Sequence, residues 1–242
     1  MTPREATTCL RACATSVSSP PSRRSELAPL APRSATVVLM AGLPATGKTT
    51  TARRLHAAAG GVLIRSCDVY QALGISLPAW VARTSGFTVG VEAYDRVRDR
   101  AYEEMARLLD ASLAASADLV VVDAVHGEPE KRQKVYEVCQ RHRATPVVVL
   151  CLCEDPVEIE RRFAARRGRE AEPEHEASDL AVYRDIQRRW RDPRDDALQD
   201  GRAPAILTYD APRDRLSVIG DPGEAFLAIA RAALGRTVAA IE

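Results

Sequence analysis

Short apolar runs alternate along this chain with longer segments that have helical periodicity. The apolar runs span residues 35–41, 62–66, 119–123, 146–153 and 205–209. Each run is short and dominated by aliphatic residues, many of them β-branched, which is typical of strands buried on both faces. Because helical segments separate these strands, the pattern predicts an α/β fold with a parallel five-stranded sheet and helices on both faces.

Helices are predicted between and after these strands. They cover residues 49–59, 91–115, 129–142 and about 178–190, and two further helices begin at Pro156 and near Glu224. Asp155 and Pro156 suit the N-cap and the first position of a helix, and Asp221-Pro222-Gly223-Glu224 repeats this signal. Residues 69–90 are interrupted by Gly and Pro, so we expect them to be irregular or briefly helical.

The first 34 residues differ in composition from the rest of the chain. They are rich in Ser, Pro, Ala and Arg, and their five Arg and two Glu give a net charge of +3. No apolar stretch resembles the core of a secretory signal, and the prolines oppose the amphipathic helix of an organelle transit peptide. We therefore expect residues 1–34 to be a disordered extension and residues 35–242 to form one domain.

Composition and charge favour neither nucleic acid nor a membrane as a partner. The formal net charge of +1 provides no general field for nucleic acid or an anionic membrane. No segment approaches the roughly 18 apolar residues of a membrane-spanning helix, so no membrane partner is expected. The six cysteines have no zinc or redox spacing, and Cys151 and Cys153 are expected on one face of a strand. Buried free thiols predict a reducing, cytoplasmic location.

A glycine-rich sequence, GLPATGKTT at residues 42–50, joins the first predicted strand to the first predicted helix. It contains G-x-x-x-x-G-K-T, a pattern that binds the phosphates of a nucleoside triphosphate. Glycine lets the backbone approach the phosphates, and the helix N-terminus favours an anion. Lys48 is expected at the β- and γ-phosphates and the Thr49 hydroxyl at Mg²⁺. The predicted cofactors are ATP and Mg²⁺, with the nucleotide bound by Gly42, Leu43, Pro44, Ala45, Thr46, Gly47, Lys48, Thr49 and Thr50.

Two aspartates follow strands whose carboxyl ends should lie near this loop. Asp123 comes directly after four apolar residues. It either ends the strand or helps Thr49 to hold Mg²⁺, directly or through water, and we expect the metal role. Asp68 is either the N-cap of a short helix or the base that orients an acceptor hydroxyl toward the γ-phosphate. The sequence leaves both roles of Asp68 open.

Five arginines crowd residues 161–169, next to an acidic loop. The segment is either a solvated basic helix face or a short lid that brings positive charge to the transferring phosphoryl group. Arg162 and Arg166 are four residues apart and share one helix face, and we expect them to act from the lid. The four histidines have no metal-binding spacing, and His126 is either a loop residue without a role or a neighbour of the site.

With these residues in view, the chain resembles the P-loop kinases described as AAA-type predicted kinases. That group is related to the 5′-kinase domains of polynucleotide kinases, zeta toxins and antibiotic phosphotransferases. The resemblance runs from about Thr36 to Tyr209 and rests on GLPATGKTT, the Asp after the second strand, LVVVDA and EIERRFAARRG. It implies an adenylate-kinase-like sheet, ATP and Mg²⁺, an acceptor-orienting Asp68, and lid arginines at Arg162 and Arg166, which match an R-x-x-x-R pair of the family.

One position departs from the family pattern. Polynucleotide-kinase-like members often carry D-x-x-R after the second strand, where the Arg contacts the acceptor. Here Gln71 stands in place of that Arg, although Arg65 or Arg83 could substitute for it.

The expected function is therefore an ATP- and Mg-dependent kinase acting on a hydroxyl of a small molecule, with Lys48, Asp68, Arg162 and Arg166 as catalytic residues. A 5′-hydroxyl nucleic-acid kinase and a nucleotide-hydrolysing regulatory ATPase are the alternatives.

Overall fold

The computed structural model describes residues 34–75, 90–167, 180–235 and 237–240, with the backbone alone for 90–94, 166–167, 180–182 and 237–240. The chain divides into Met1–Pro32 and Arg33–Glu242, and all of the described residues belong to the second part. Apart from Ser34, the predicted disordered extension lies outside the described residues. Ser34 itself is attached to the domain, because its Oγ donates to the carbonyl of Arg143 at 2.7 Å.

Seven strands form one sheet in the described part of the chain, in the order β2-β3-β1-β4-β5-β6-β7. Their bounds are β1 Thr36–Ala41, β2 Val62–Arg65, β3 Leu119–Asp123, β4 Thr145–Leu152, β5 Ala205–Asp210, β6 Arg215–Ile219 and β7 Thr237–Ala240. The first five are the strands that the apolar runs predict, and they are mutually parallel. The predicted α/β class and parallel sheet are therefore confirmed.

The prediction of five strands was wrong in number. β6 pairs antiparallel with β5 after a short turn, and β7 adds to β6 in parallel. β6 reads RLSVI, in which apolar residues do not form an uninterrupted run, and its first residue is exposed. Only strands buried on both faces give a continuous apolar signal, so this strand escaped notice.

The helices agree closely with the pattern of the sequence. Their bounds are α1 Lys48–Ala59, α2 Ser66–Ala72, α4 Gly90–Ala114, α5 Pro129–His142, α6 Pro156–Arg167, α7 Leu180–Arg189 and α8 Glu224–Leu234, with a 3₁₀ turn at Pro193–Asp195. The Asp155 carboxylate accepts a hydrogen bond from the amide of Val157 at 2.9 Å, as its N-cap role predicts. No helix in the described ranges combines the length and apolar character needed to cross a bilayer; the cytoplasmic location stays a prediction.

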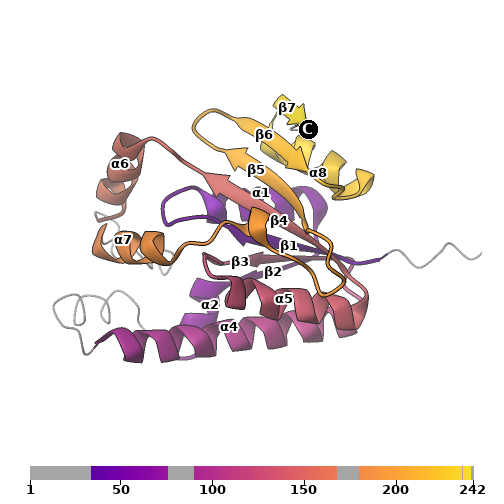
Figure 1. Ribbon diagram of the computed structural model, residues 1–242, viewed down its shortest axis with the longest axis horizontal. Coiled ribbons are helices and arrows are strands. Elements are labelled where there is room, and N and C mark those ends of the chain that lie inside the picture. Colours follow the sequence, from indigo (N-terminus) through magenta and orange to yellow (C-terminus); the bar gives the residue numbers. More distant parts are fainter. Residues whose placement is uncertain (1–33, 76–89, 168–179, 236, 241–242) are drawn as a thin grey trace, which may run out of the picture. The chain divides into compact units, whose positions relative to one another are not determined.

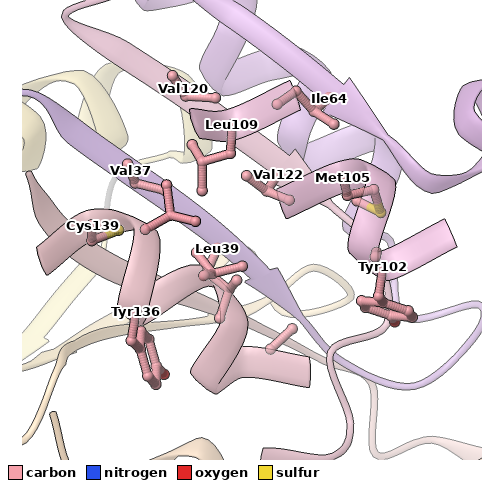
Figure 2. Close-up of a cluster of buried hydrophobic side chains, with 14 of the residues drawn as sticks. Val37, Leu39, Ile64, Tyr102, Met105, Leu109, Val120, Val122, Tyr136 and Cys139 are labelled. Atoms are coloured by element: carbon pink, nitrogen blue, oxygen red, sulfur yellow. The ribbon is translucent and has the colours of Figure 1, made fainter. Parts of the chain in front are cut away.

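The core has two layers, one on each face of the sheet. Val37 and Leu39 of β1 pack with α4 and α5 on one face, whereas Val38 and Met40 pack with α1 and α8 on the other. Figure 1 shows these helix pairs on opposite sides of the strands, and Figure 2 shows the first layer, where Leu109 of α4 approaches the strands. This alternation follows from the two-residue period of a strand.

A buried charged network joins the first layer to the segment that follows α7. The Arg132 guanidinium is fully buried and binds both carboxylate oxygens of Asp196, at 2.5 and 2.6 Å. Arg132 also donates to the carbonyl of His126 at 2.8 Å, and the Tyr136 hydroxyl donates to Asp196 at 2.8 Å. The network thus fixes α5, the loop after β3 and the 3₁₀ turn relative to one another.

Removing the carboxylate of Asp196 should strongly destabilise the domain. Asp196→Ala would leave the Arg132 charge buried and uncompensated, which costs about 3–5 kcal/mol of unfolding free energy. Asp195→Ala is the matched control, because Asp195 is the exposed neighbour, and a surface change of this kind stays within about 0.5 kcal/mol. Urea unfolding of both variants measures the difference, and equal stability of the two would contradict the assignment.

Candidate active site

The candidate site forms where the carboxyl ends of parallel strands meet. The glycine-rich loop follows β1 at the centre of the sheet, and Asp123 ends β3 beside it. Arg65, the last residue of β2, lies directly across from Asp123 in the register of the two strands. β4, on the other side of β1, leads into α6, and Figure 1 shows α6 and α7 at this edge of the sheet. Ligands of open α/β sheets bind at such an edge.

The conformation of the loop requires glycine at its first position. Gly42 has φ 143°, and a Cβ there would lie 2.5 Å from the carbonyl oxygen of Cys151 on β4. Its amide donates to the carbonyl of Val125 at 3.2 Å, so the loop is tied to the segment after β3 as well. Gly47, at the other end of the loop, has φ 102° and is the N-cap of α1. The backbone therefore takes a path that other residues would obstruct.

Lys48 reaches back over the loop. Its ammonium group donates to the carbonyl of Leu43 at 2.9 Å, and the Thr46 hydroxyl donates to the same carbonyl at 2.8 Å. No side chain caps the first turn of α1, whose amide groups have no acceptor within the helix. A positive side chain and a helix N-terminus thus converge on one loop, an arrangement suited to binding phosphate.

Thr49 and Asp123 come together as the metal prediction requires. Burial raises the pKa of the Asp123 carboxyl, whereas the charge of Lys48, a hydrogen bond with Thr49 and the charge of Arg65 lower that pKa. A buried carboxylate beside a threonine hydroxyl supplies the oxygen ligands that Mg²⁺ prefers, with phosphates and water as its further ligands. The two side chains therefore fit a Mg²⁺ ion bound together with a nucleotide.

The structure changes the interpretation of Asp68. Helix α2 begins at Ser66 with Arg65 as its N-cap, so of the two roles left open for Asp68, that of helix N-cap is ruled out. Asp68 lies in the first turn of α2 instead, and its side chain is half-exposed. Its carboxylate oxygen is 3.4 Å from Nη1 of Arg65. Because Arg65 also acts on Asp123, it links the two aspartates. Sequence reasoning considered Arg65 for an acceptor phosphate and missed this contact.

Arg162 is held against the glycine-rich loop. Its Nη1 donates to the carbonyl of Ala45 at 2.8 Å, and its Nε donates to Glu158 at 2.6 Å. Glu158 also binds Arg161, and these two arginines hold the pKa of the Glu158 carboxyl down at about 2. The prediction for Arg166 concerns a side chain outside the described residues; its backbone lies in α6.

An apolar contact supports this polar one. Ala45 packs with Ile159 and Phe163 of α6, and all three are buried. Phe163 in turn meets the Tyr183 ring of α7 edge-on, with centroids 5.7 Å apart. The first part of the predicted lid therefore rests on the loop that it was expected to cover. The tip of the predicted lid, residues 168–179, lies outside the described residues.

His126 lies beneath the site. The ring is fully buried, and its Nδ1 is 2.8 Å from the carbonyl of Met40 on β1. Its Nε2 has no hydrogen-bond partner among the described residues. Burial lowers the pKa of His126 to about 4, and the positive charges of Arg132 and Lys48 act in the same direction. His126 is therefore a neutral structural support of β1 and the loop, a role that sequence reasoning left open.

The two cysteines near the end of β4 differ in their surroundings. Cys151 is buried in the second core layer, as predicted, and burial raises the pKa of its thiol to about 12. Cys153 lies beyond the last residue of β4 and is partly exposed. The prediction of two thiols on one strand face was thus wrong for Cys153, because the strand ends one residue before it.

A comparison with protein families identifies the group to which this site belongs. A family model described as an AAA domain matches residues 37–193, which is more than half of the chain and runs from β1 through the 3₁₀ turn. The chain belongs to this family. The match contains the glycine-rich loop, Asp68, Asp123 and α6, so the resemblance noted from these residues is confirmed.

Comparisons with individual proteins give similarity of fold alone. No curated protein matched the chain. Among solved structures, a gluconokinase from Sinorhizobium meliloti 1021 is 16% identical, with a TM-score of 0.45 over 84% of this chain and 90% of that one. A sugar kinase from Janibacter sp. HTCC2649 is 16% identical, with a TM-score of 0.49 over 83% and 94%. Chaetomium thermophilum Kti12, in complex with ADP-AlF3, is 19% identical, with a TM-score of 0.45 over 82% and 95%. Such distant similarities assign no substrate to this chain.

The burial of His126 predicts how stability depends on pH. Unfolded His126 would bind a proton near pH 6.5, whereas the folded ring does so only near pH 4. The unfolded state therefore binds more protons in this window, and unfolding free energy should fall by up to about 3 kcal/mol as pH drops through it. In His126→Asn, whose amide can still donate to Met40, this part of the loss should vanish. Urea unfolding at several pH values measures both slopes, and identical slopes would contradict the prediction.

Proposed function

We propose that this protein is an ATP- and Mg²⁺-dependent kinase that transfers the γ-phosphoryl group to a hydroxyl of a small molecule. The observation that carries the proposal is the convergence of Lys48, Thr49 and Asp123 on the glycine-rich loop, with Arg162 bonded to the same loop. Nucleotide binding alone would need only the loop and Lys48. The additional carboxylate and guanidinium are the groups that phosphoryl transfer uses.

In this proposal, each side chain acts on a different part of the nucleotide. The loop amides and Lys48 would bind the phosphates, and Thr49 and Asp123 would hold Mg²⁺. When bound, the ion neutralises charge on the phosphate oxygens. Arg162 would give up its hydrogen bond to the Ala45 carbonyl and bind the phosphoryl group instead, where negative charge develops during transfer. Glu158 would keep the Arg162 guanidinium at the loop in the meantime.

Asp68 is proposed as the residue that orients the acceptor hydroxyl. It follows β2, whose carboxyl end lies at the same edge of the sheet as the loop. Arg65 Nη1 lies 3.4 Å from the Asp68 carboxylate, and a carboxylate in this position can accept a proton from a hydroxyl. Gln71, which replaces a charged residue of the polynucleotide-kinase pattern, supports a small-molecule acceptor over a nucleic acid 5′ end.

Substitution of Asp68 separates phosphoryl transfer from hydrolysis. Asp68→Asn keeps the shape of the side chain but removes the proton acceptor, so transfer to the acceptor should fall by about 10²–10⁴-fold. Binding of ATP should persist, because the loop is unchanged. The assay screens sugars, nucleosides, antibiotics and 5′-hydroxyl oligonucleotides for ATP consumption, and follows product and phosphate release together.

Lys48→Ala is the reference for this experiment, since it should abolish both transfer and hydrolysis. If no acceptor stimulates ATP use and Asp68→Asn lowers hydrolysis as well, the protein is a nucleotide hydrolase. Stimulation by oligonucleotides alone would identify a nucleic-acid kinase.

The paired arginines of α6 offer a second test. Arg162→Ala should lower kcat by about 10²–10³-fold and change ATP affinity much less, because the charge that it meets develops during transfer. Arg161→Ala is the matched control: Arg161 binds the same Glu158, but its side chain is 68% exposed. Steady-state kinetics and nucleotide titration of both variants give the comparison. Equal effects of the two substitutions would remove Arg162 from the reaction.

A further inference from the structure

A cavity of about 530 Å³ opens beside the glycine-rich loop. Leu43 and Thr46 of the loop form one side, the end of β4 forms the floor, and α6 and α7 form the opposite wall. The volume falls within the roughly 300–1,000 Å³ of sites that bind small molecules.

The cavity adjoins the end of the loop where the γ-phosphate would lie. A lysine at this position of the motif contacts the β- and γ-phosphates. The Lys48 ammonium is 2.9 Å from the carbonyl of Leu43, and Leu43 lines the cavity. A molecule in the cavity would therefore approach the phosphoryl group that is transferred.

One face of α7 supplies the most distinctive part of the wall. Tyr183 and Gln187, four residues apart on α7, line the cavity together with Trp190, which directly follows the last residue of the helix. The floor is apolar, with Leu150 and Leu152 of β4. Aromatic rings with one amide beside them can stack on an apolar ring face and bind hydroxyl groups.

This wall is anchored to the rest of the domain. Arg189 Nη1 binds the carboxylate of Asp95 on α4 at 2.9 Å, and the amide of Arg191 donates to the carbonyl of Gly127 at 2.8 Å. Trp190 packs so closely on Gly127 that a Cβ there would lie 3.0 Å from the indole ring. The aromatic surface is therefore held in place before any ligand binds.

The charges around the cavity do not favour an anionic ligand. Among the described residues that line it, Arg184 is the only cationic one, whereas Glu154, Glu160 and Asp192 are carboxylates. Glu154 and Asp192 are paired with arginines outside the lining, at 3.2 and 2.6 Å. A phosphorylated molecule would bring about two negative charges into surroundings with no excess of positive charge.

We propose that this cavity binds the acceptor, and that the acceptor is an uncharged, ring-containing polyhydroxyl compound stacked on Trp190. The inference rests on the proposed kinase function and adds the substrate class and the place where it binds. Asp68 does not line the cavity. In this proposal the cavity binds the ring of the acceptor, and the residue that orients the acceptor hydroxyl lies outside the cavity lining.

Tryptophan fluorescence tests binding without requiring turnover. The chain has two tryptophans, and Trp80→Phe leaves Trp190 as the only tryptophan to be excited selectively. Trp80→Phe protein would be studied in the presence of Mg²⁺ and a non-hydrolysable ATP analogue. The titrants would be monosaccharides, cyclic polyols and nucleosides, each in its unphosphorylated and its phosphorylated form. The expected result is saturable change in emission with an unphosphorylated compound and none with its phosphorylated form. Response to phosphorylated compounds only, or to no compound, overturns the inference.

Kinetic variants distinguish failure of this inference from failure of the kinase proposal. Trp190→Ala should raise the KM for the acceptor by about tenfold with little change in ATP affinity. Gln187→Ala, at an exposed position, gives the same test without disturbing the core, and Arg188→Ala on the solvent side is the control. Emission change without phosphoryl transfer supports the cavity and refutes the kinase. Transfer to a compound whose KM neither cavity variant alters refutes the cavity alone.

Discussion

Burial of β1 on both faces is the constraint on which the rest of the structure depends. Its residues from Val37 to Ala41 are wholly shielded from solvent, and β3 and β4 pair with its two edges. A strand placed in this way cannot shift in register without moving apolar side chains between two different core layers. The loop that follows β1 therefore starts from a fixed point, and this point lies where the neighbouring strands also end.

The glycine-rich loop is held by its neighbours as much as by its own sequence. Gly42 touches the backbone of β4, the Ala45 side chain packs on α6, and the Ala45 carbonyl accepts from Arg162. Helix α6, which carries Arg162, is thus in direct contact with the loop backbone that would bind phosphate. Such a connection positions a charge before a ligand arrives, which lowers the reorganisation that catalysis requires.

Charged groups in the described interior occur in connected sets. The fully buried Arg132 and the nearly buried Asp196 side chain neutralise each other, and at the sheet edge Arg65 lies across from Asp123 and contacts Asp68. The first set is satisfied internally and serves the fold. The second contains a carboxylate whose burial opposes ionisation, and a cation bound there would relieve this condition. The first set therefore belongs to the fold, and the second is the set to which we assign a function.

Local patterns in the sequence determined most of the fold and the central part of the site. Continuous apolar runs identified the five strands that are buried on both faces, Asp155 marked the start of α6, and GLPATGKTT identified the loop. These features depend on neighbours in the chain, so the sequence displays them directly. The sequence did not reveal β6, because a strand at the margin of a sheet need not carry a continuous apolar run. Contacts between distant segments were decided only by the tertiary structure: Arg65 with Asp123, Arg162 with Ala45, and the cavity lined by α6 and α7. They require side chains from separate strands and helices to meet, and no spacing along the chain encodes which of several arginines will do so.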